Sequence, residues 1–184
     1  MFSNRYKKKK QKLKDLHRKA AESRKYAHNE DVNKLRVLGD HCLVENMNIK
    51  GLQRKAKGVT KNKNGKYNRR KRYGRSISKR SPGYFIKQAK YRFESTGGKF
   101  DEVNTWTFKA SQYDHMLNDT TEKQLSIRWH KLPNGIKVQR DLYSAFLLYC
   151  ANDDLKTPNY DQCIKFFNEF LTLHEKCING IKDN

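Results

Sequence analysis

The sequence lacks long apolar runs, paired cysteines and, through its middle third, almost all acidic residues. No window approaches the roughly 20 consecutive apolar residues that a membrane-spanning helix needs. No apolar stretch follows the basic N-terminal residues, as one would in a signal peptide. The sequence therefore predicts a cytoplasmic protein without a membrane partner.

Cysteine is present, but not in the spacing that metal or redox chemistry requires. The four cysteines stand far apart and no Cys-x-x-Cys pair occurs among Cys42, Cys150, Cys163 and Cys177. Each lies in an apolar stretch, which is typical of a reduced core residue. The spacing therefore favours four reduced core cysteines over a disulfide framework or a zinc site.

Negative charge is missing where positive charge is densest. The 184-residue chain has a formal net charge of +22, and between Asp40 and Glu94 its only acidic residue is Glu45. The segment from Arg54 to Arg80, here called the basic block, contains many lysines and arginines and no acidic residue. Its charges repel one another unless a polyanion neutralises them, which favours nucleic acid as the partner. A solvated basic tail without sequence preference is the alternative, whereas a membrane surface is disfavoured because no apolar helical face adjoins the block. The candidate nucleic-acid-binding residues in the block are Arg54, Lys55, Lys57, Arg69, Arg70, Lys71, Arg72 and Arg75.

The apolar spacing predicts a mixed helical and strand protein with one domain and basic extensions. Tyr6, Leu13, Leu16 and Ala20 form a narrow apolar stripe on a basic helix. The basic block is too rich in Gly, Lys and Asn to pack, so it is expected to be a loop that orders on its partner. The predicted helices are 4–27, 32–38, 81–97, 140–151 and 160–181, with strands at 41–46 and 99–106 and the loop over 54–81. The stripe of the last helix is expected to be core: Ile164, Phe167, Phe170, Leu171 and Leu173.

Two carboxylates are candidates for chemistry. Glu45 ends the apolar strand that begins near His41, and the bare pattern favours a buried ion pair over a metal ligand. Asp141 stands near a predicted helix start, where a carboxylate can simply cap the helix. In the chemical interpretation, the two carboxylates converge on Mg²⁺ in a site for phosphodiester hydrolysis, which normally needs a third carboxylate.

Several segments, in order, resemble the C-terminal part of the TnpB-type (OrfB) proteins, transposon-encoded RNA-guided nucleases. The segment Val44-Glu-Asn-Met-Asn-Ile-Lys-Gly-Leu52 is similar to the signature Val-Glu-Asp/Asn-Leu-Asn-Val-Lys-Gly-Met of that family. Arg140-Asp141-Leu142-x-x-Ala145 resembles its Asp-Arg-Asp-x-Asn-Ala-Ala motif. Weaker matches lie at 3–25, 83–94, 125–128 and Gly135.

The resemblance implies an α/β fold class, which becomes α+β when the family's first strands are missing. The expected architecture is a partial RuvC/RNase H-like fold with basic N-terminal helices and C-terminal helices. It makes Glu45 and Asp141 the second and third metal-binding carboxylates, with Mg²⁺ as their ion, and DNA and a guide RNA as partners. The corresponding segments are a basic helical segment (1–40), a partial RuvC-like core with the basic loop (41–106), a hairpin in place of the zinc ribbon (107–140), and a C-terminal RuvC helix with a terminal helix (141–184).

The chain departs from the family pattern in two places. The family's first catalytic aspartate precedes the basic helices, and this chain begins inside them, so we expect weak activity alone and an N-terminal polypeptide that completes the core. The zinc-ribbon cysteines are missing from 109–116 and 129–135. Asp114, His115 and His130 could in principle bind zinc, but no zinc is expected; a hairpin held by Trp106 and Trp129 is the alternative.

Arg128 is expected to contact phosphate or substrate, and a structural salt bridge is equally compatible. Three interpretations of the whole chain stay open. They are the C-terminal piece of a metal-dependent nuclease, a non-catalytic RNA- or DNA-binding protein such as a repressor, and a decayed transposon remnant. The resemblance favours a TnpB-like nucleic-acid-binding protein that retains two of three catalytic carboxylates.

Overall fold

The computed structural model describes residues 2–54, 58, 60–67, 73–124 and 126–182. Helix accounts for 57% and strand for 14% of the described residues, so the class is α+β. The chain divides into two compact units: Met1–Cys42 with Asn48–Phe100, and Leu43–Met47 with Asp101–Asn184. Across the described residues, no helix is long and apolar enough to cross a membrane.

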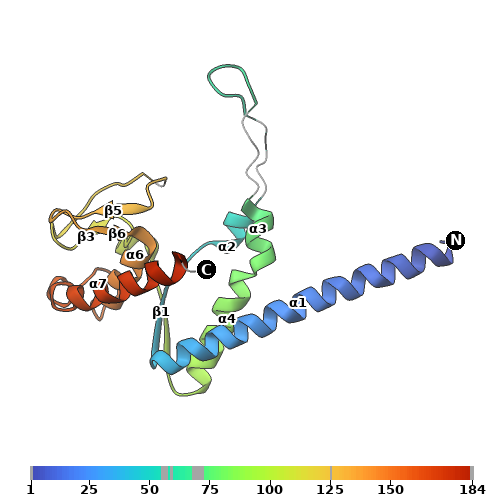
Figure 1. Ribbon diagram of the computed structural model, residues 1–184, viewed down its shortest axis with the longest axis horizontal. Helices are drawn as coiled ribbons and strands as arrows, with labels where there is room; N and C mark the ends of the chain where they lie inside the picture. Colours follow the sequence, from blue (N-terminus) through green and yellow to red (C-terminus); the bar gives the residue numbers. More distant parts are fainter. Residues whose placement is uncertain (1, 55–57, 59, 68–72, 125, 183–184) are drawn as a thin grey trace. The chain divides into compact units, whose positions relative to one another are not determined.

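The first unit is built on one long helix, α1 (Asn4–Leu38), which packs against α4 (Pro82–Ser95) near its C-terminal end (Figure 1). Val32 of α1 is buried, as are Ala89 and Phe93 of α4. The prediction of two helices, 4–27 and 32–38, is wrong because residues 28–31 contain neither Gly nor Pro, so the helix continues until Gly39.

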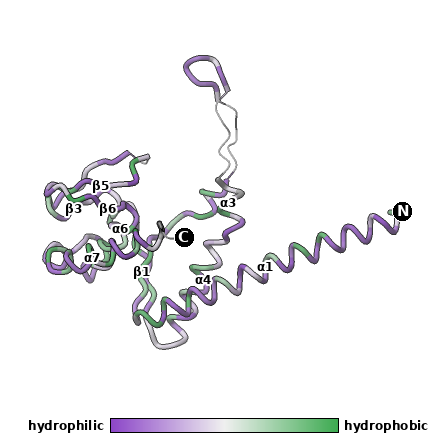
Figure 2. Tube along the Cα trace, in the orientation of Figure 1, coloured by the Kyte–Doolittle hydropathy of each residue, from purple (hydrophilic) through white to green (hydrophobic). Residues whose placement is uncertain are grey.

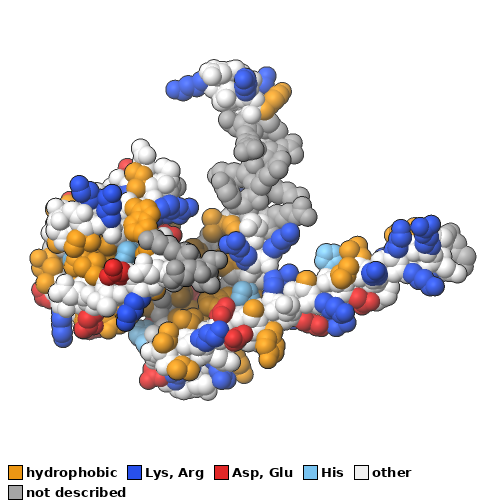
Figure 3. Space-filling model, in the orientation of Figure 1, with side chains coloured by type: hydrophobic (Ala, Val, Ile, Leu, Met, Phe, Trp, Pro, Cys, Tyr) orange, Lys and Arg blue, Asp and Glu red, His pale blue; other side chains and the backbone are white. Residues whose placement is uncertain are grey.

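The N-terminal half of α1 extends away from α4, and its apolar stripe has no covering element within the described part of this unit. The stripe residues Tyr6, Leu13 and Leu16 are exposed, and polar and apolar residues alternate along this half of the helix (Figure 2). Lysine and arginine side chains cluster around its end in Figure 3. The helix is therefore held to α4 through its C-terminal half and not through the stripe of Tyr6, Leu13 and Leu16.

The basic block is not a loop throughout. After α2 (Ile49–Gln53), residues 60–67 form a turn in which Lys61 and Tyr67 make an isolated β-bridge. The block then ends in a helix, α3 (Tyr73–Arg80), which packs on α2. The loop prediction for 54–81 is wrong over α3. Residues 75–80 contain neither Gly nor Pro, and a high content of Lys and Arg does not oppose helix formation.

Two short strands run through both units. β1 (His41–Glu45) pairs with β2 (Lys99–Val103). Lys99 N–H donates to Asp40 C=O at 2.7 Å, and Asn46 N–H donates to Val103 C=O at 2.9 Å. The N-terminal ends of the two strands are thus hydrogen-bonded to each other, and so are their C-terminal ends, so the strands are parallel. The crossover that joins them contains α2, α3 and α4.

The beginning of this pair depends on a glycine. At Gly98, a Cβ atom would lie 2.5 Å from the backbone oxygen of Asp40. Any side chain there would push the start of β2 away from Asp40, the residue before β1. The predicted strand 99–106 is shorter than expected, since the chain turns into α5 (Thr105–Phe108), with Asn104 Oδ1 accepting from Trp106 N–H at 2.9 Å.

The second unit is organised by two C-terminal helices and two small hairpins. Each hairpin is antiparallel: β3 (Tyr113–Asp114) with β4 (Asp119–Thr120), and β5 (Trp129–Lys131) with β6 (Lys137–Gln139). The helices α6 (Arg140–Tyr149) and α7 (Tyr160–Lys182) match the predicted 140–151 and 160–181 within about one turn.

Aromatic side chains join α6 to α7. The rings of Phe146 and Phe170 stack with their centroids 4.6 Å apart, and Phe167 packs beside them. The buried face of α7 consists of Cys163, Phe167, Phe170 and His174. Of the stripe predicted for this helix, Ile164 and Leu173 are exposed, so the buried face is rotated from the predicted one.

The cysteine prediction is correct for the core pair only. Cys150 and Cys163 are fully buried free thiols that contact each other, which connects the end of α6 to the first turn of α7. Cys42 is half-buried and Cys177 is exposed. Cys177 is therefore not a core residue, although it lies in an apolar stretch of sequence.

Leu147→Ala should lower the free energy of unfolding by about 2–5 kcal/mol, because the Leu147 side chain is fully buried in the α6–α7 core. The matched control is Leu173→Ala on α7, where the leucine is 61% exposed, and its cost should stay within about 0.5 kcal/mol. Urea unfolding followed by circular dichroism measures both changes. Equal costs would contradict the described core.

Candidate functional site

Glu45 is the last residue of β1, and its position is set by the α6–α7 core. Leu43, two residues earlier on the same strand, packs against that core. Side chains two apart on a strand share a face, so Glu45 is turned to the same side as Leu43. The carboxylate is half-buried as a result.

Asp141 lies in the first turn of α6, but it does not cap the helix. The cap is Gln139, whose Oε1 accepts from Leu142 N–H at 2.7 Å. The Asp141 carboxylate instead accepts from Gln139 Nε2 at 3.2 Å and from Arg140 Nε at 3.4 Å. The capping interpretation of Asp141 is therefore wrong, and no local sequence signal identified Gln139 as the cap.

Glu45 and Asp141 come within electrostatic range of each other in the second unit. The pKa of Glu45 is raised above its ordinary value, first because burial removes water from the carboxylate and second because Asp141 repels its charge. Among the residues that the structure describes, no hydrogen bond or ion pair is found for the Glu45 carboxylate. The buried ion pair that the bare sequence pattern favours is thus missing from this part of the chain.

Two carboxylates that repel each other form a fitting pair of ligands for a divalent cation, which would remove the repulsion. Oxygen ligands of this kind are those that Mg²⁺ prefers. The described ranges nonetheless contain no group of three or more His, Cys, Asp and Glu that could hold a metal ion. The two carboxylates are therefore donors of the kind that Mg²⁺ prefers, and a complete site would need further ligands.

Two arginines adjoin the Asp141 side of this pair. Arg128 Nη1 lies 3.8 Å from Asp141 Oδ2, with both side chains well exposed. Arg140 is largely buried, and its guanidinium also contacts the backbone oxygen of Ile127 at 3.4 Å. An exposed pair such as Arg128 with Asp141 contributes at most about 1 kcal/mol, so Arg128 is held loosely and its guanidinium remains accessible to a phosphate.

The candidate nucleic-acid-binding residues of the basic block belong to the first unit. Arg54 is exposed at the end of α2, and Arg75 lies on α3. Further along α3, Lys79 and Arg80 are exposed. The other candidates, Lys55, Lys57, Arg69, Arg70, Lys71 and Arg72, lie outside the described residues.

Two of the three side chains considered for zinc do meet. Asp114 is buried, and its Oδ2 lies 3.0 Å from His130 Nε2, which joins β3 to β5. The ammonium of Lys123 lies 3.2 Å from the same His130 nitrogen. Burial lowers the pKa of Lys123, and the nearby Asp114 charge partly offsets that effect.

His115 turns the other way, into the aromatic core. Its Nδ1 lies 2.6 Å from the Tyr143 hydroxyl oxygen, which also accepts from the His115 backbone N–H at 3.1 Å. Burial lowers the pKa of His115, because the charged imidazolium would lose its hydration. Burial also raises the pKa of Tyr143, so both side chains stay neutral. Within the described chain the His115 Nε2 atom has no hydrogen-bond partner.

The alternative of a hairpin held by Trp106 and Trp129 is wrong. Trp106 is 85% exposed, and Trp129 is 46% exposed with its ring edge against His174. The hairpins are joined instead by Asp114, His130 and the Tyr143 ring, which lies 5.7 Å from the His130 ring. Sequence reasoning missed Tyr143 and Lys123, since no spacing signal connects either residue to the hairpins.

Comparison with known proteins adds no assignment: no family model matches the chain, and no curated protein matches it. The site is therefore interpreted from its own geometry and from the motifs in the sequence.

Glu45→Gln should raise the melting temperature at pH 7, measured in EDTA, because the substitution removes a half-buried charge that Asp141 repels. The raised pKa means that the wild-type glutamate is most stabilising below the ordinary carboxyl pKa and loses that stability as pH rises. The advantage of the variant should therefore shrink as pH falls toward about 4. Differential scanning calorimetry across this range measures the effect.

The matched control for this experiment is Glu102→Gln, on the exposed face of β2. It should change the melting temperature little at any of these pH values. A lower melting temperature for Glu45→Gln at pH 7 would mean that the glutamate has a stabilising cationic partner.

Proposed function

We propose that this chain is a TnpB-like nucleic-acid-binding protein that corresponds to the C-terminal part of an RNA-guided, metal-dependent DNA endonuclease. The observation that carries the proposal is the half-buried Glu45 carboxylate, which lies beside the like charge of Asp141 and is not paired with any described cation. A fold that only needed stability would gain from a neutral residue at position 45. A pair of this kind is favourable when a divalent cation binds to it.

The residues of the site have separate roles in this proposal. Glu45 and Asp141 would hold a divalent cation such as Mg²⁺, which when bound supplies Lewis-acid stabilisation to a phosphodiester. Arg128, exposed beside Asp141, would contact the phosphate. A site for phosphodiester hydrolysis normally needs a third carboxylate, and the described residues contain no group of three such ligands. With Glu45 and Asp141 alone, we expect nucleic-acid binding and weak cleavage.

The basic residues supply the affinity for DNA and guide RNA. The block from Arg54 to Arg80 contains no acidic residue. Its exposed cations among the described residues include Arg54, Lys61, Lys63, Lys66, Lys79 and Arg80. Cations that are not paired within the protein remain available to neutralise phosphates and release counterions. The proposed location of the protein is the cytoplasm.

Binding of a labelled DNA or RNA strand should weaken steeply with salt, by about one power of salt concentration per neutralised phosphate. Changing Arg69, Arg70, Lys71 and Arg72 together to Gln should make this dependence shallower by up to about 0.9 per lost contact on duplex DNA. Fluorescence anisotropy at several salt concentrations measures the slope. Binding without salt dependence, or no binding at all, would overturn the proposal.

The matched control changes the same number of charges in the second unit. It replaces Lys137, Lys156, Lys165 and Lys176, all exposed, with Gln. Its slope should stay close to that of the wild type. Equal losses in the two variants would show that net charge alone determines binding and would contradict a role for the basic block.

Mg²⁺ at about 10 mM should raise the melting temperature above that in NaCl of equal ionic strength, because an ion that binds only the folded state stabilises it. A dissociation constant of about 1 mM would give about 1.4 kcal/mol. Asp141→Asn and Glu45→Gln should each remove most of this gain, whereas the Glu102→Gln control should keep it. An unchanged gain in both site variants would contradict the metal-ligand assignment.

A further inference from the structure

Trp106 is a large aromatic side chain that the fold does not use for its core. It lies on α5 and is 85% exposed, whereas Phe108 and Ala110 next to it are buried. The backbone that carries the indole is fixed on both sides, by the Asn104 cap and by the buried Phe108. The indole is therefore an apolar surface held in a defined position and left open to solvent.

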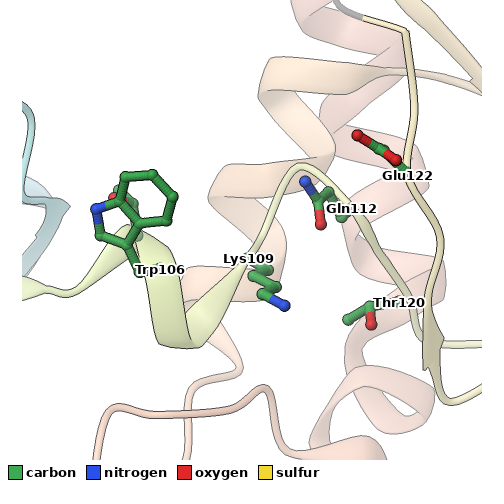
Figure 4. Close-up of a pocket in the computed structure, with 6 residues that line it drawn as sticks. Trp106, Lys109, Gln112, Thr120 and Glu122 are labelled. Carbon is green, nitrogen blue, oxygen red and sulfur yellow. The ribbon is translucent and has the colours of Figure 1, made fainter.

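The indole borders a cleft of about 560 Å³, all of it within the second unit. Figure 4 shows Trp106 at one side, Gln112, Thr120 and Glu122 at the other, and Lys109 between them with its ammonium directed toward Thr120. Two hydrogen bonds fix the walls relative to each other: Gln112 N–H donates to Lys109 C=O at 2.8 Å, and Thr121 N–H donates to Gln112 C=O at 3.0 Å. The cleft is thus bounded by connected backbone and not by separate mobile segments.

The side chains around this cleft match the parts of one nucleotide. A planar indole can stack on the face of a base, and the Lys109 ammonium can pair with a phosphate. The Gln112 amide, the Thr120 hydroxyl and the Glu122 carboxylate offer donors and acceptors for the base edge or the sugar. A polar peptide would also meet the hydrogen-bonding groups, but it would leave the exposed indole without a flat partner.

We infer that this cleft binds one unpaired base of a single-stranded nucleic acid, stacked on Trp106 with its phosphate at Lys109. The inference rests on the proposed function to the extent that it takes nucleic acid as the partner. It deepens that function by assigning a second contact, on the unit that carries Glu45 and Asp141. A duplex does not fit this chemistry, because the faces of its bases are already stacked on one another.

The chain contains only two tryptophans, which makes the contact directly measurable. The Trp129→Phe variant keeps Trp106 as its sole tryptophan, and Trp106→Phe keeps Trp129. A single-stranded oligonucleotide of about 12 bases should quench the fluorescence of Trp129→Phe as it binds, since stacking places a base against the indole. The Trp106→Phe variant should show little quenching at the same saturation.

Anisotropy of a labelled strand, recorded on the same samples, separates binding from stacking. Trp106→Ala should weaken single-strand binding by about 5- to 150-fold, with an unchanged far-ultraviolet circular dichroism spectrum, because the exposed indole is not part of the core. Lys109→Gln should make the salt dependence shallower by about 0.7. Lys131→Gln, at an exposed lysine of β5, is the matched control and should change neither quantity.

The possible results have different consequences. A strand that binds by anisotropy without quenching Trp106 would overturn the stacking site and leave the proposed function standing. If a duplex quenches as strongly as the single strand, the bound base need not be unpaired, and this part of the inference is wrong. If a mononucleotide quenches at a lower concentration than the strand, the cleft prefers a free nucleotide, and the assignment to a single strand is wrong. No binding of any nucleic acid would contradict the proposed function itself.

Discussion

The packing of α6 on α7 is the constraint on which the candidate site depends. Phe146 of α6 stacks on Phe170 of α7, and Leu43 of β1 packs against the same cluster. This core therefore fixes two elements that are far apart in the sequence, the end of β1 and the start of α6. The charged residues Glu45 and Asp141 occupy those two ends, and their mutual repulsion is a consequence of apolar packing beneath them.

The position of Glu45 beside Asp141 lowers the stability of the fold. A half-buried carboxylate beside a like charge is unfavourable unless something compensates it, and among the described residues no cation contacts Glu45. Asp141 differs, because Arg128 and Arg140 lie near it. The two carboxylates therefore differ in surroundings: Asp141 has two arginines beside it, whereas Glu45 has no cationic partner among the described residues.

The hairpin region shows how a small unit can be held together by polar side chains. The resemblance leads one to expect two pairs of cysteines there, and the chain has none in these stretches. Asp114 from one hairpin and His130 from the other contact each other at 3.0 Å in a mostly buried setting. The Lys123 side chain lies 3.2 Å from the same His130 nitrogen and donates to the Tyr113 carbonyl at 3.4 Å, so it adds a further polar contact with both hairpins.

The sequence by itself determined the positions of the longer helices α1, α4, α6 and α7 and of the strands β1 and β2, together with the uneven charge and the two carboxylates. The shorter helices and the strands β3 to β6 were not predicted. Helix 81–97 and strand 41–46 were predictable because Pro82, Gly97 and the alternation near Glu45 are local signals. The continuity of α1 and the helix α3 were missed although the local sequence allows them, since neither 28–31 nor 75–80 contains Gly or Pro. The buried face of α7 was not predictable, because it depends on how α7 packs against α6.

Only the tertiary structure decided which residues meet. Loop lengths and periodicity do not encode that Glu45 lies within electrostatic range of Asp141, that Gln139 caps α6 in place of Asp141, or that His115 turns from the hairpin toward Tyr143. Nor do they show that Trp106 stays outside the core while Phe108 enters it. Local sequence sets the conformation of a segment, but contacts between distant segments are set by how their apolar faces pack together.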